Sequence, residues 1–214
     1  MKKIMFILFL FITMFLCYII YELTDNDKLY YTSIGDNISN NMYIKDIKNL
    51  YKHNNYFVNK DYRTIDLLNI IRYNEEITIN NSQVSIHQIL KKSDIIILSI
   101  GMNDIYHKLN DNTKDIYTYS NNMINNIELI LDEINRYDHL KVYVLGYYNI
   151  TNKHNDIYTY LNYKLKRITE KNNYIYIDLN SILRNNPKYL IKNDNYYLNN
   201  EGYKEIMKLI VEKF

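Results

Sequence analysis

Three short polar segments carry the side chains of this chain that could do chemistry. Residues 35–37 read Gly-Asp-Asn, residues 101–104 read Gly-Met-Asn-Asp, and residues 194–203 form a polar stretch that ends in Gly-Tyr. Carboxylates orient neighbouring groups and exchange protons, and amides donate hydrogen bonds to developing negative charge. These residue types therefore indicate acid–base or charge-stabilising chemistry on a small ligand.

A hydroxyl nucleophile and an imidazole base are present only at less orderly positions. Ser39 lies two residues beyond Asn37, and His107 follows Asn103 closely. They form a conceivable nucleophile–base pair, although nothing in the spacing requires the two segments to converge. The five histidines are scattered and make no metal-ligand pattern, so we expect neither a metal nor another cofactor. The single cysteine, Cys17, permits no internal disulfide.

The elements that must position these segments follow an alternating pattern. Short β-rich runs alternate with helical periodicity, which is typical of a parallel sheet with crossover helices. We expect strands over residues 29–34, 56–58, 94–100, 142–146 and 174–178. We expect helices over residues 64–72, 116–137, 158–170 and 202–214, and one that includes 44–51. Residues 76–80 are expected to form an edge excursion, and Ser85 to cap a short helix.

The predicted fold is a three-layer α/β/α sandwich with a five-stranded parallel sheet, formed by residues 25–214. Ligands of open parallel sheets bind at the carboxyl ends of the strands. The segments at residues 35–37 and 101–104 both follow predicted strands, and each begins with a glycine that permits a tight turn. The sequence therefore predicts that the polar segments meet at one edge of the sheet.

The three segments together resemble the blocks of the SGNH, or GDSL, hydrolase family. Its members have Gly-Asp-Ser after the first strand, Gly-x-Asn-Asp after the third and Asp-x-x-His before a final helix. The matching segments here are residues 34–37, 99–104 and 194–203, and residues 61–68 look like the second block. The resemblance spans about residues 29–214. It implies a flavodoxin-like SGNH hydrolase fold and acyl-ester hydrolysis by serine triad logic.

The match departs from the family at the two reacting positions. Asn37 stands at the nucleophile position and Tyr197 at the base position, while the resemblance assigns supporting roles to Asp36, Asn103 and Asp194. An amide has no ionisable nucleophilic oxygen, and a phenol with an ordinary pKa near 10 is a poor base at neutral pH. No glycine of the second block is visible in residues 59–64. We therefore expect a weakly active or inactive, ligand-binding member.

Two other functions stay open on the sequence. The first is a working hydrolase of acyl esters, on lipid or on cell-envelope glycan, that uses a non-standard nucleophile. The second is a nucleotide-binding flavodoxin-like module, which the first loop disfavours because it lacks both a glycine-rich phosphate cradle and a P-loop lysine. A net charge of only +2 without a basic stripe argues against nucleic acid. The expected ligand is a small molecule, or a lipid or glycan ester.

The N-terminal segment, residues 1–24, predicts a membrane anchor. Lys2 and Lys3 precede an uncharged apolar run over residues 4–21, which is long enough to cross the hydrocarbon core. The positive flank predicts a cytoplasmic N-terminus and an extracytoplasmic main domain. A cleavable signal peptide, and hence secretion, is the alternative, although no small-x-small cleavage site follows the run.

Overall fold

The fold is built on one parallel sheet. The computed structural model describes residues 2–25, 29–36, 54–58, 61–79, 82–110, 115–150, 153–191 and 197–213. The five strands run in the order β2-β1-β5-β6-β7, and every neighbouring pair is parallel. Their bounds are β1 Tyr31–Gly35, β2 Asn54–Val58, β5 Ile95–Ser99, β6 Lys141–Leu145 and β7 Ile175–Ile177.

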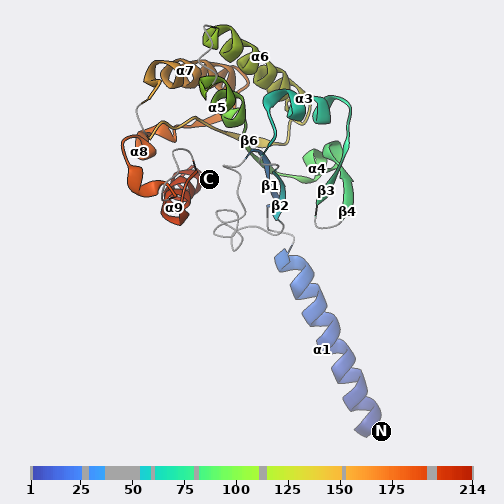
Figure 1. The fold of residues 1–214 in the computed structure, drawn as a ribbon. Helices are drawn as coiled ribbons and strands as arrows, with labels where there is room; N and C mark the ends of the chain where they lie inside the picture. Colours follow the sequence, from blue (N-terminus) through green and yellow to red (C-terminus); the bar gives the residue numbers. More distant parts are fainter. Residues whose placement is uncertain are drawn as a thin grey trace.

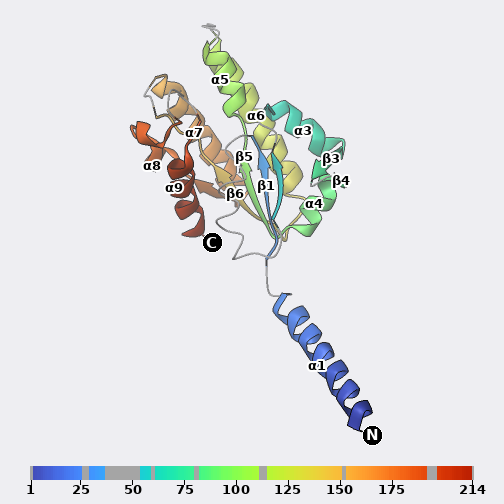
Figure 2. The ribbon, with the colours of Figure 1, turned by 60° about the horizontal axis from the view of Figure 1, so that its bottom comes forward.

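Helices cover both faces of this sheet, as Figures 1 and 2 show. One face carries α3 Thr64–Arg72, α4 Ile86–Lys92, α6 Ile116–Ile134 and α7 Asn155–Lys171. The other face carries α8 Asn180–Leu183, the 3-10 turn η1 Pro187–Tyr189 and α9 Asn200–Val211. Helix α5, Met102–Asn110, starts at the edge where the strands end. The three predicted layers are therefore confirmed.

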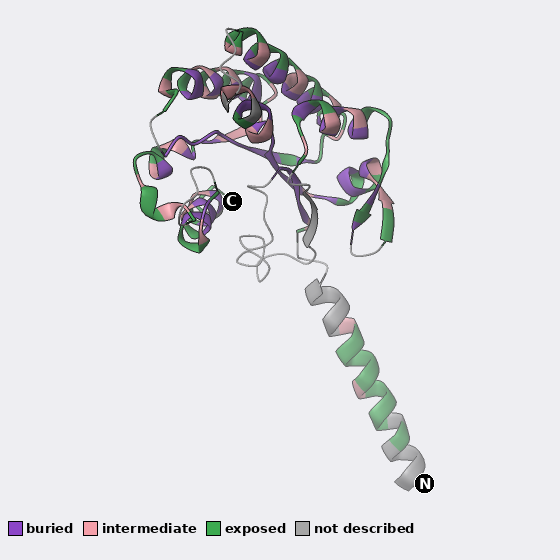
Figure 3. Cartoon of the chain, in the orientation of Figure 1, coloured by how far each residue is buried: buried purple, intermediate pink, exposed green. Residues whose placement is uncertain are grey.

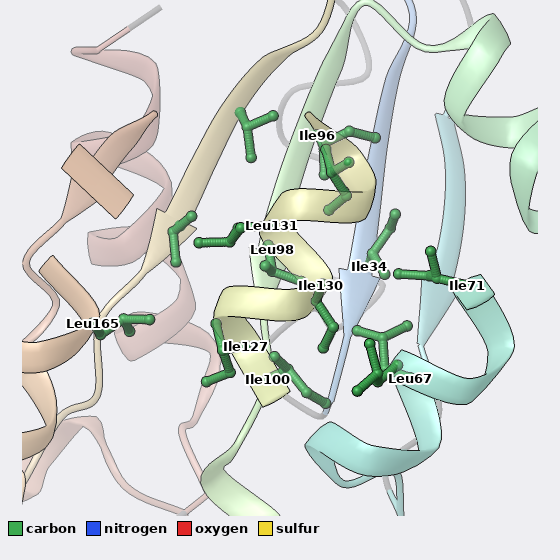
Figure 4. Packing of buried hydrophobic residues seen from close by; sticks show 14 of the residues in the cluster. Ile34, Leu67, Ile71, Ile96, Leu98, Ile100, Ile127, Ile130, Leu131 and Leu165 are labelled. Carbon is green, nitrogen blue, oxygen red and sulfur yellow. The ribbon is translucent and has the colours of Figure 1, made fainter. Parts of the chain in front are cut away.

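The sheet separates two hydrophobic clusters because successive side chains of a strand point to opposite faces. In β5, Ile96 and Leu98 belong to the cluster under α3, α6 and α7, whereas Ile95 and Ile97 belong to the cluster under α8 and α9. Figure 4 shows the first cluster, and Figure 3 shows the buried sheet between exposed outer helix faces. Burial on both faces explains why the central strands read as near-continuous apolar runs.

Most of the predicted elements are confirmed, and several differ in detail. Strand positions agree to within two residues and α3 has the predicted bounds, whereas the helix predicted around 44–51 lies outside the described residues. The edge excursion is a separate antiparallel pair, β3 Glu76–Ile79 with β4 Ser82–Ser85. Ser85 does precede α4, but its hydroxyl donates to Asn74 and makes no capping hydrogen bond. Helix α5 was not predicted, because its Asn-Asp start is also typical of a turn.

The N-terminal segment forms helix α1, Lys2–Asp25, which projects away from the sheet domain (Figure 1). Its described apolar side chains are largely exposed, among them Phe9, Phe11 and Phe15. Within the described residues, however, none of the helices combines the length and apolar character needed to cross a membrane. The predicted transmembrane helix is therefore not supported.

Candidate active site

The site is built where β1 and β5 end side by side. Gly35 has a φ of +131°, and a Cβ at this position would collide with the backbone carbonyl of Ser99. The same close approach lets the Asp36 N–H donate to Ser99 O at 2.7 Å. Only glycine allows the two strand ends to lie this near each other in this conformation. Gly35 and Asp36 are therefore held directly against Ser99 at the end of β5.

Asp36 joins this first loop to helix α5. Its side chain is buried, with Oδ1 accepting from the Ser99 hydroxyl at 3.2 Å and Oδ2 accepting from the Met102 N–H at 3.0 Å. Met102 is the first residue of α5, so the carboxylate faces the positive end of that helix dipole. Asp36 is therefore a positioning residue that ties the end of β1 to the start of α5.

Gly101 makes the turn from β5 into α5, with a φ of +109°. A Cβ there would lie 2.5 Å from the hydroxyl of Tyr147, which donates to the Ile100 carbonyl at 2.9 Å. Burial raises the pKa of the Tyr147 phenol well above its usual value, and the carboxylates of Asp104 and Asp36 raise it further. The phenol consequently stays protonated and holds the backbone just before the turn.

Asn103 is held in a defined orientation at the first turn of α5. Its Nδ2 donates to the backbone carbonyl of Tyr62 at 2.9 Å, and its side chain is partly buried. This bond fixes the plane of the amide, whose nitrogen carries two N–H donors. An amide oriented in this way suits a role in donating a hydrogen bond to negative charge on a bound ligand.

Asp104, the next residue, ties α5 to the start of α3. Its Oδ2 accepts from the Thr64 N–H and its Oδ1 from the Thr64 hydroxyl, both at 2.9 Å, and Asn126 Nδ2 donates to that hydroxyl oxygen at 3.2 Å. Burial raises the pKa of Asp104 above its usual value, although the Thr64 hydrogen bonds act in the opposite direction. Together, Asp104 and Asn103 fasten α5 to the segment that the sequence identified as a second block.

Tyr197 lies in the segment before α9, and its side chain is 42% exposed. Its carbonyl accepts from the Ile191 N–H at 2.9 Å, and an isolated bridge pairs Leu190 with Leu198. Two residues later, Asn199 Oδ1 caps α9 by accepting from the N–H groups of Glu201 and Gly202. The segment at the predicted base position therefore has a fixed backbone at its end next to α9.

The structure brings together only some of the predicted site residues. Asp36 accepts a hydrogen bond from Met102, the residue before Asn103, so both predicted residues lie at the start of α5, while Tyr197 lies in the segment before α9. Asn37, Asp194 and Ser39 fall outside the described residues. His107 lies on α5, but the placement of its side chain is also outside the description, so its pairing with Ser39 stays untested. No cluster of three potential metal ligands occurs in the part of the chain that the structure describes.

Sequence analysis missed the residues that support the site. Tyr62, Thr64 and Tyr147 form hydrogen bonds to residues 100–104 across sequence separations of 41, 40 and 47 residues, and Asn126 bonds Thr64 across 62 residues. Periodicity reports on neighbours within an element, so it carries no signal for such contacts. The likeness of residues 61–68 to a family block was the one available indication that this segment matters.

The order of the strands and the helices on both faces define an α/β protein with a parallel sheet, whose polar segments lie at the carboxyl ends of the strands. The model of the GDSL-like lipase/acylhydrolase family matches residues 55–205. The chain belongs to this family, as the three polar segments indicated. Membership favours the hydrolase interpretation over the nucleotide-binding alternative.

Solved structures share the fold at low sequence identity. The lipase Lip_vut3 from a goat rumen metagenome is 16% identical, with a TM-score of 0.70 over 86% of this chain and 96% of its own. The acetyl xylan esterase AlAXEase is 15% identical, with a TM-score of 0.66 over 86% and 99%. Axe2, an acetylxylan esterase from Geobacillus stearothermophilus, is 14% identical, with a TM-score of 0.66 over 86% and 93%. No curated protein matches the chain in sequence.

Proposed function

We propose that this chain is an acyl-ester hydrolase-like protein whose ester-splitting chemistry is weak or lost and whose site retains ligand binding. The observation that carries the proposal is the contrast between two sets of residues. The supporting contacts of Asp36 and Asn103 are intact. The two positions at which the family uses Ser and His carry Asn37 and Tyr197.

The chemistry explains why the two substitutions matter most. Ester hydrolysis of this type needs a hydroxyl that attacks the acyl carbon, a base that removes its proton, and donors that hold the oxyanion. The Asn103 amide supplies a donor of the third kind, which is typically worth about 3 to 4 kcal/mol in the transition state. Such a donor can bind an ester carbonyl without any turnover. A ligand with an acyl group, on a lipid or a glycan, is therefore the proposed occupant.

The deciding experiment restores the missing groups. Hydrolysis of p-nitrophenyl acetate is measured for the parent chain, for Asn37→Ser/Tyr197→His, and for the same double variant carrying Asn103→Ala. We expect a nearly silent parent and a double variant with clear turnover. The added Asn103→Ala should then lower that turnover by about 100- to 1,000-fold, as loss of one oxyanion donor does. A double variant that folds but stays silent would contradict the proposal.

A working hydrolase with a non-standard nucleophile is the second candidate, and the oriented Asn103 amide favours it. Its test uses the parent chain alone. Turnover by the parent that falls on Asn103→Ala and disappears on Ser39→Ala would establish this candidate and overturn the first. Parent activity that survives both changes would indicate a contaminating esterase, and the first candidate would then stand on the double variant.

We also propose that the hydrolase-like domain lies outside the cytoplasm. The support is the order of charges, with Lys2 and Lys3 before the apolar run and the acidic Glu22 and Asp25 after it. The segment would act as an export signal, either retained or cleaved. Protease accessibility of the domain in intact cells tests the location, and N-terminal sequencing of the mature chain distinguishes retention from cleavage. A domain protected until the cells are lysed would contradict export.

A further inference from the structure

A cleft opens at the edge of the sheet where β6 and β7 begin. Its volume is about 560 Å³, which lies within the usual range for ligand pockets of about 300–1,000 Å³. Two turns form its walls, one between α6 and β6 and the other between α7 and β7. Asp36 and Asn103 belong to segments that follow the strand ends, so this cleft lies at the opposite edge of the sheet. It is therefore separate from the candidate active site.

Three rings line the cleft: Tyr137, His139 and Tyr174. The rings of Tyr137 and His139 meet edge to face, with centroids 6.4 Å apart. Both tyrosines are partly buried, whereas His139 is exposed. Burial raises the pKa of Tyr174 to about 12, so its hydroxyl stays a proton donor at neutral pH. The rings combine apolar surface with polar edges, a mixture that suits ligands having one apolar and one wet face.

Three amides, those of Asn135, Asn172 and Asn173, lie among these rings. The Tyr174 hydroxyl donates to Asn135 Oδ1 at 3.4 Å, and Asn172 Nδ2 donates to the Ile168 carbonyl at 2.9 Å. Asn173 is exposed and has a φ of +58°. Each amide can both donate and accept, so the set matches ligands whose groups do the same.

The formal charges of the lining indicate a neutral ligand. Asp138 and Lys141 contribute one charge of each sign. A phosphate or another anion would call for a cluster of cations. A purely apolar ligand would cover amide atoms of these three side chains without offering them a hydrogen bond, which is unfavourable. A neutral chain of sugar rings needs no cation cluster and can form hydrogen bonds with the amides. Its C–H faces can lie on the aromatic rings while its hydroxyls reach the amides.

We propose that this cleft is a carbohydrate-binding site that takes a neutral oligosaccharide, separate from the candidate active site. Its occupation does not depend on ester hydrolysis. Binding of a sugar polymer in this cleft would raise the local concentration of that polymer at the opposite edge of the sheet, where the candidate active site lies. The inference stands whether or not the candidate active site turns over.

The test is isothermal titration of the full chain with neutral hexasaccharides: xylohexaose, cellohexaose and chitohexaose. Two variants alter the cleft with little risk to folding. His139→Ala removes an exposed ring, and Asn173→Gly removes an amide while glycine accepts the positive φ. Tyr73→Ala is the matched control, because Tyr73 is 74% exposed next to α3 and does not line the cleft.

We expect at least one hexasaccharide to bind, with its dissociation constant raised about 5-fold or more by each cleft variant and unchanged by Tyr73→Ala. Absence of binding for all three sugars up to about 10 mM would overturn the proposal, since even a 1 mM dissociation constant is only about −4.1 kcal/mol. Binding that Asn103→Ala abolishes and both cleft variants leave intact would also overturn it. That second result would place the sugar at the candidate active site.

Discussion

At the scale of single residues, Asp104 is the side chain whose protonation matters most for the folded chain. It is buried, and both of its oxygens accept from Thr64. Desolvation disfavours the charged form, and this effect outweighs the hydrogen bonds, so the pKa in the folded chain lies above the value of 3.8 expected for an exposed carboxyl. The folded chain therefore binds this proton more tightly than the unfolded chain does.

The linkage of protonation to folding gives the first prediction. The stabilisation from protonated Asp104 is complete below pH 3.8 and is lost as the pH rises through the higher folded pKa. Asp104→Asn has no such titration. We expect the free energy of unfolding of the parent to fall relative to that of Asp104→Asn as the pH rises from about 4 to 7. Urea unfolding of both chains at several pH values measures this difference.

The control for this prediction is Asp132→Asn, which removes the same charge from an exposed position on α6. If general surface charge set the pH dependence, Asp132→Asn and Asp104→Asn would behave alike. If the free energy of unfolding of the parent rose relative to that of Asp104→Asn as the pH increased, the Thr64 hydrogen bonds would outweigh burial.

At the scale of elements, the end of β1 depends on Gly35. A Cβ there would collide with backbone atoms, and substituting a neighbouring side chain cannot relieve a collision with backbone. A Cβ at Gly35 meets the Ser99 backbone, whereas a Cβ at Gly101 meets the Tyr147 hydroxyl. Both residues have positive φ, which costs other residues about 1–3 kcal/mol. A substitution at Gly101 can therefore be accommodated by changing the Tyr147 side chain, whereas a substitution at Gly35 meets backbone atoms that cannot be removed.

We predict that Gly35→Ala lowers the free energy of unfolding by about 3 kcal/mol or more, since the collision adds to the strain of the positive φ. Gly101→Ala should also destabilise the chain, but combining it with Tyr147→Phe should recover part of the loss, because the phenyl ring lacks the hydroxyl that is the nearest atom a Cβ would meet. Chemical unfolding of the three variants measures this. A Gly35→Ala chain as stable as the parent would show that β1 and β5 can separate without cost.

The start of α9 depends on Asn199, whose two side-chain ends have different partners. Its Oδ1 caps the helix, while its Nδ2 donates to the carbonyls of Lys188 at 2.6 Å and Leu190 at 2.9 Å. We predict that Asn199→Ala costs about 1–2 kcal/mol from the cap alone, with a further loss from the two carbonyls. Asn199→Ser keeps an oxygen that can cap the helix and removes the donors, so its unfolding midpoint should lie between those of Asn199→Ala and the parent. Equal midpoints for both variants would mean that the cap contributes little.

At the scale of the whole molecule, the sequence predicted what neighbouring residues encode. The five strands follow from apolar runs of strand length, and α3 from the spacing of Ile65, Leu68 and Ile71. Leu68 and Ile71 are buried as expected, whereas Ile65 is 40% exposed and Leu67 lies on the buried face instead. Helix α5 was missed because a turn and a helix start share the residue types Asn and Asp. The family blocks correctly placed Asp36 and Asn103 at adjacent strand ends, while the Asp104–Thr64 contact could not be predicted, because it joins residues 40 positions apart.

The two hydrophobic clusters hold the sheet domain together, and among the described residues neither cluster contains a side chain of α1. Apolar residues of α1 are exposed instead, including Phe11 at 69%. A contiguous exposed apolar surface promotes association with other molecules, and it contributes nothing to the stability of a domain that it does not contact. Stability and self-association should therefore respond differently to removal of this helix.

We predict that a shortened chain beginning at Asp25 unfolds in urea with a free energy within about 0.5 kcal/mol of that of the full chain, the scatter usual for changes away from a core. The shortened chain should also elute from size exclusion as a narrower peak, because the exposed apolar helix is gone. Substituting Leu98, which is buried under α6, by Ala is the control and should cost about 2–5 kcal/mol in either chain. If removal of α1 cost as much as Leu98→Ala, the helix would have to pack on the domain in solution.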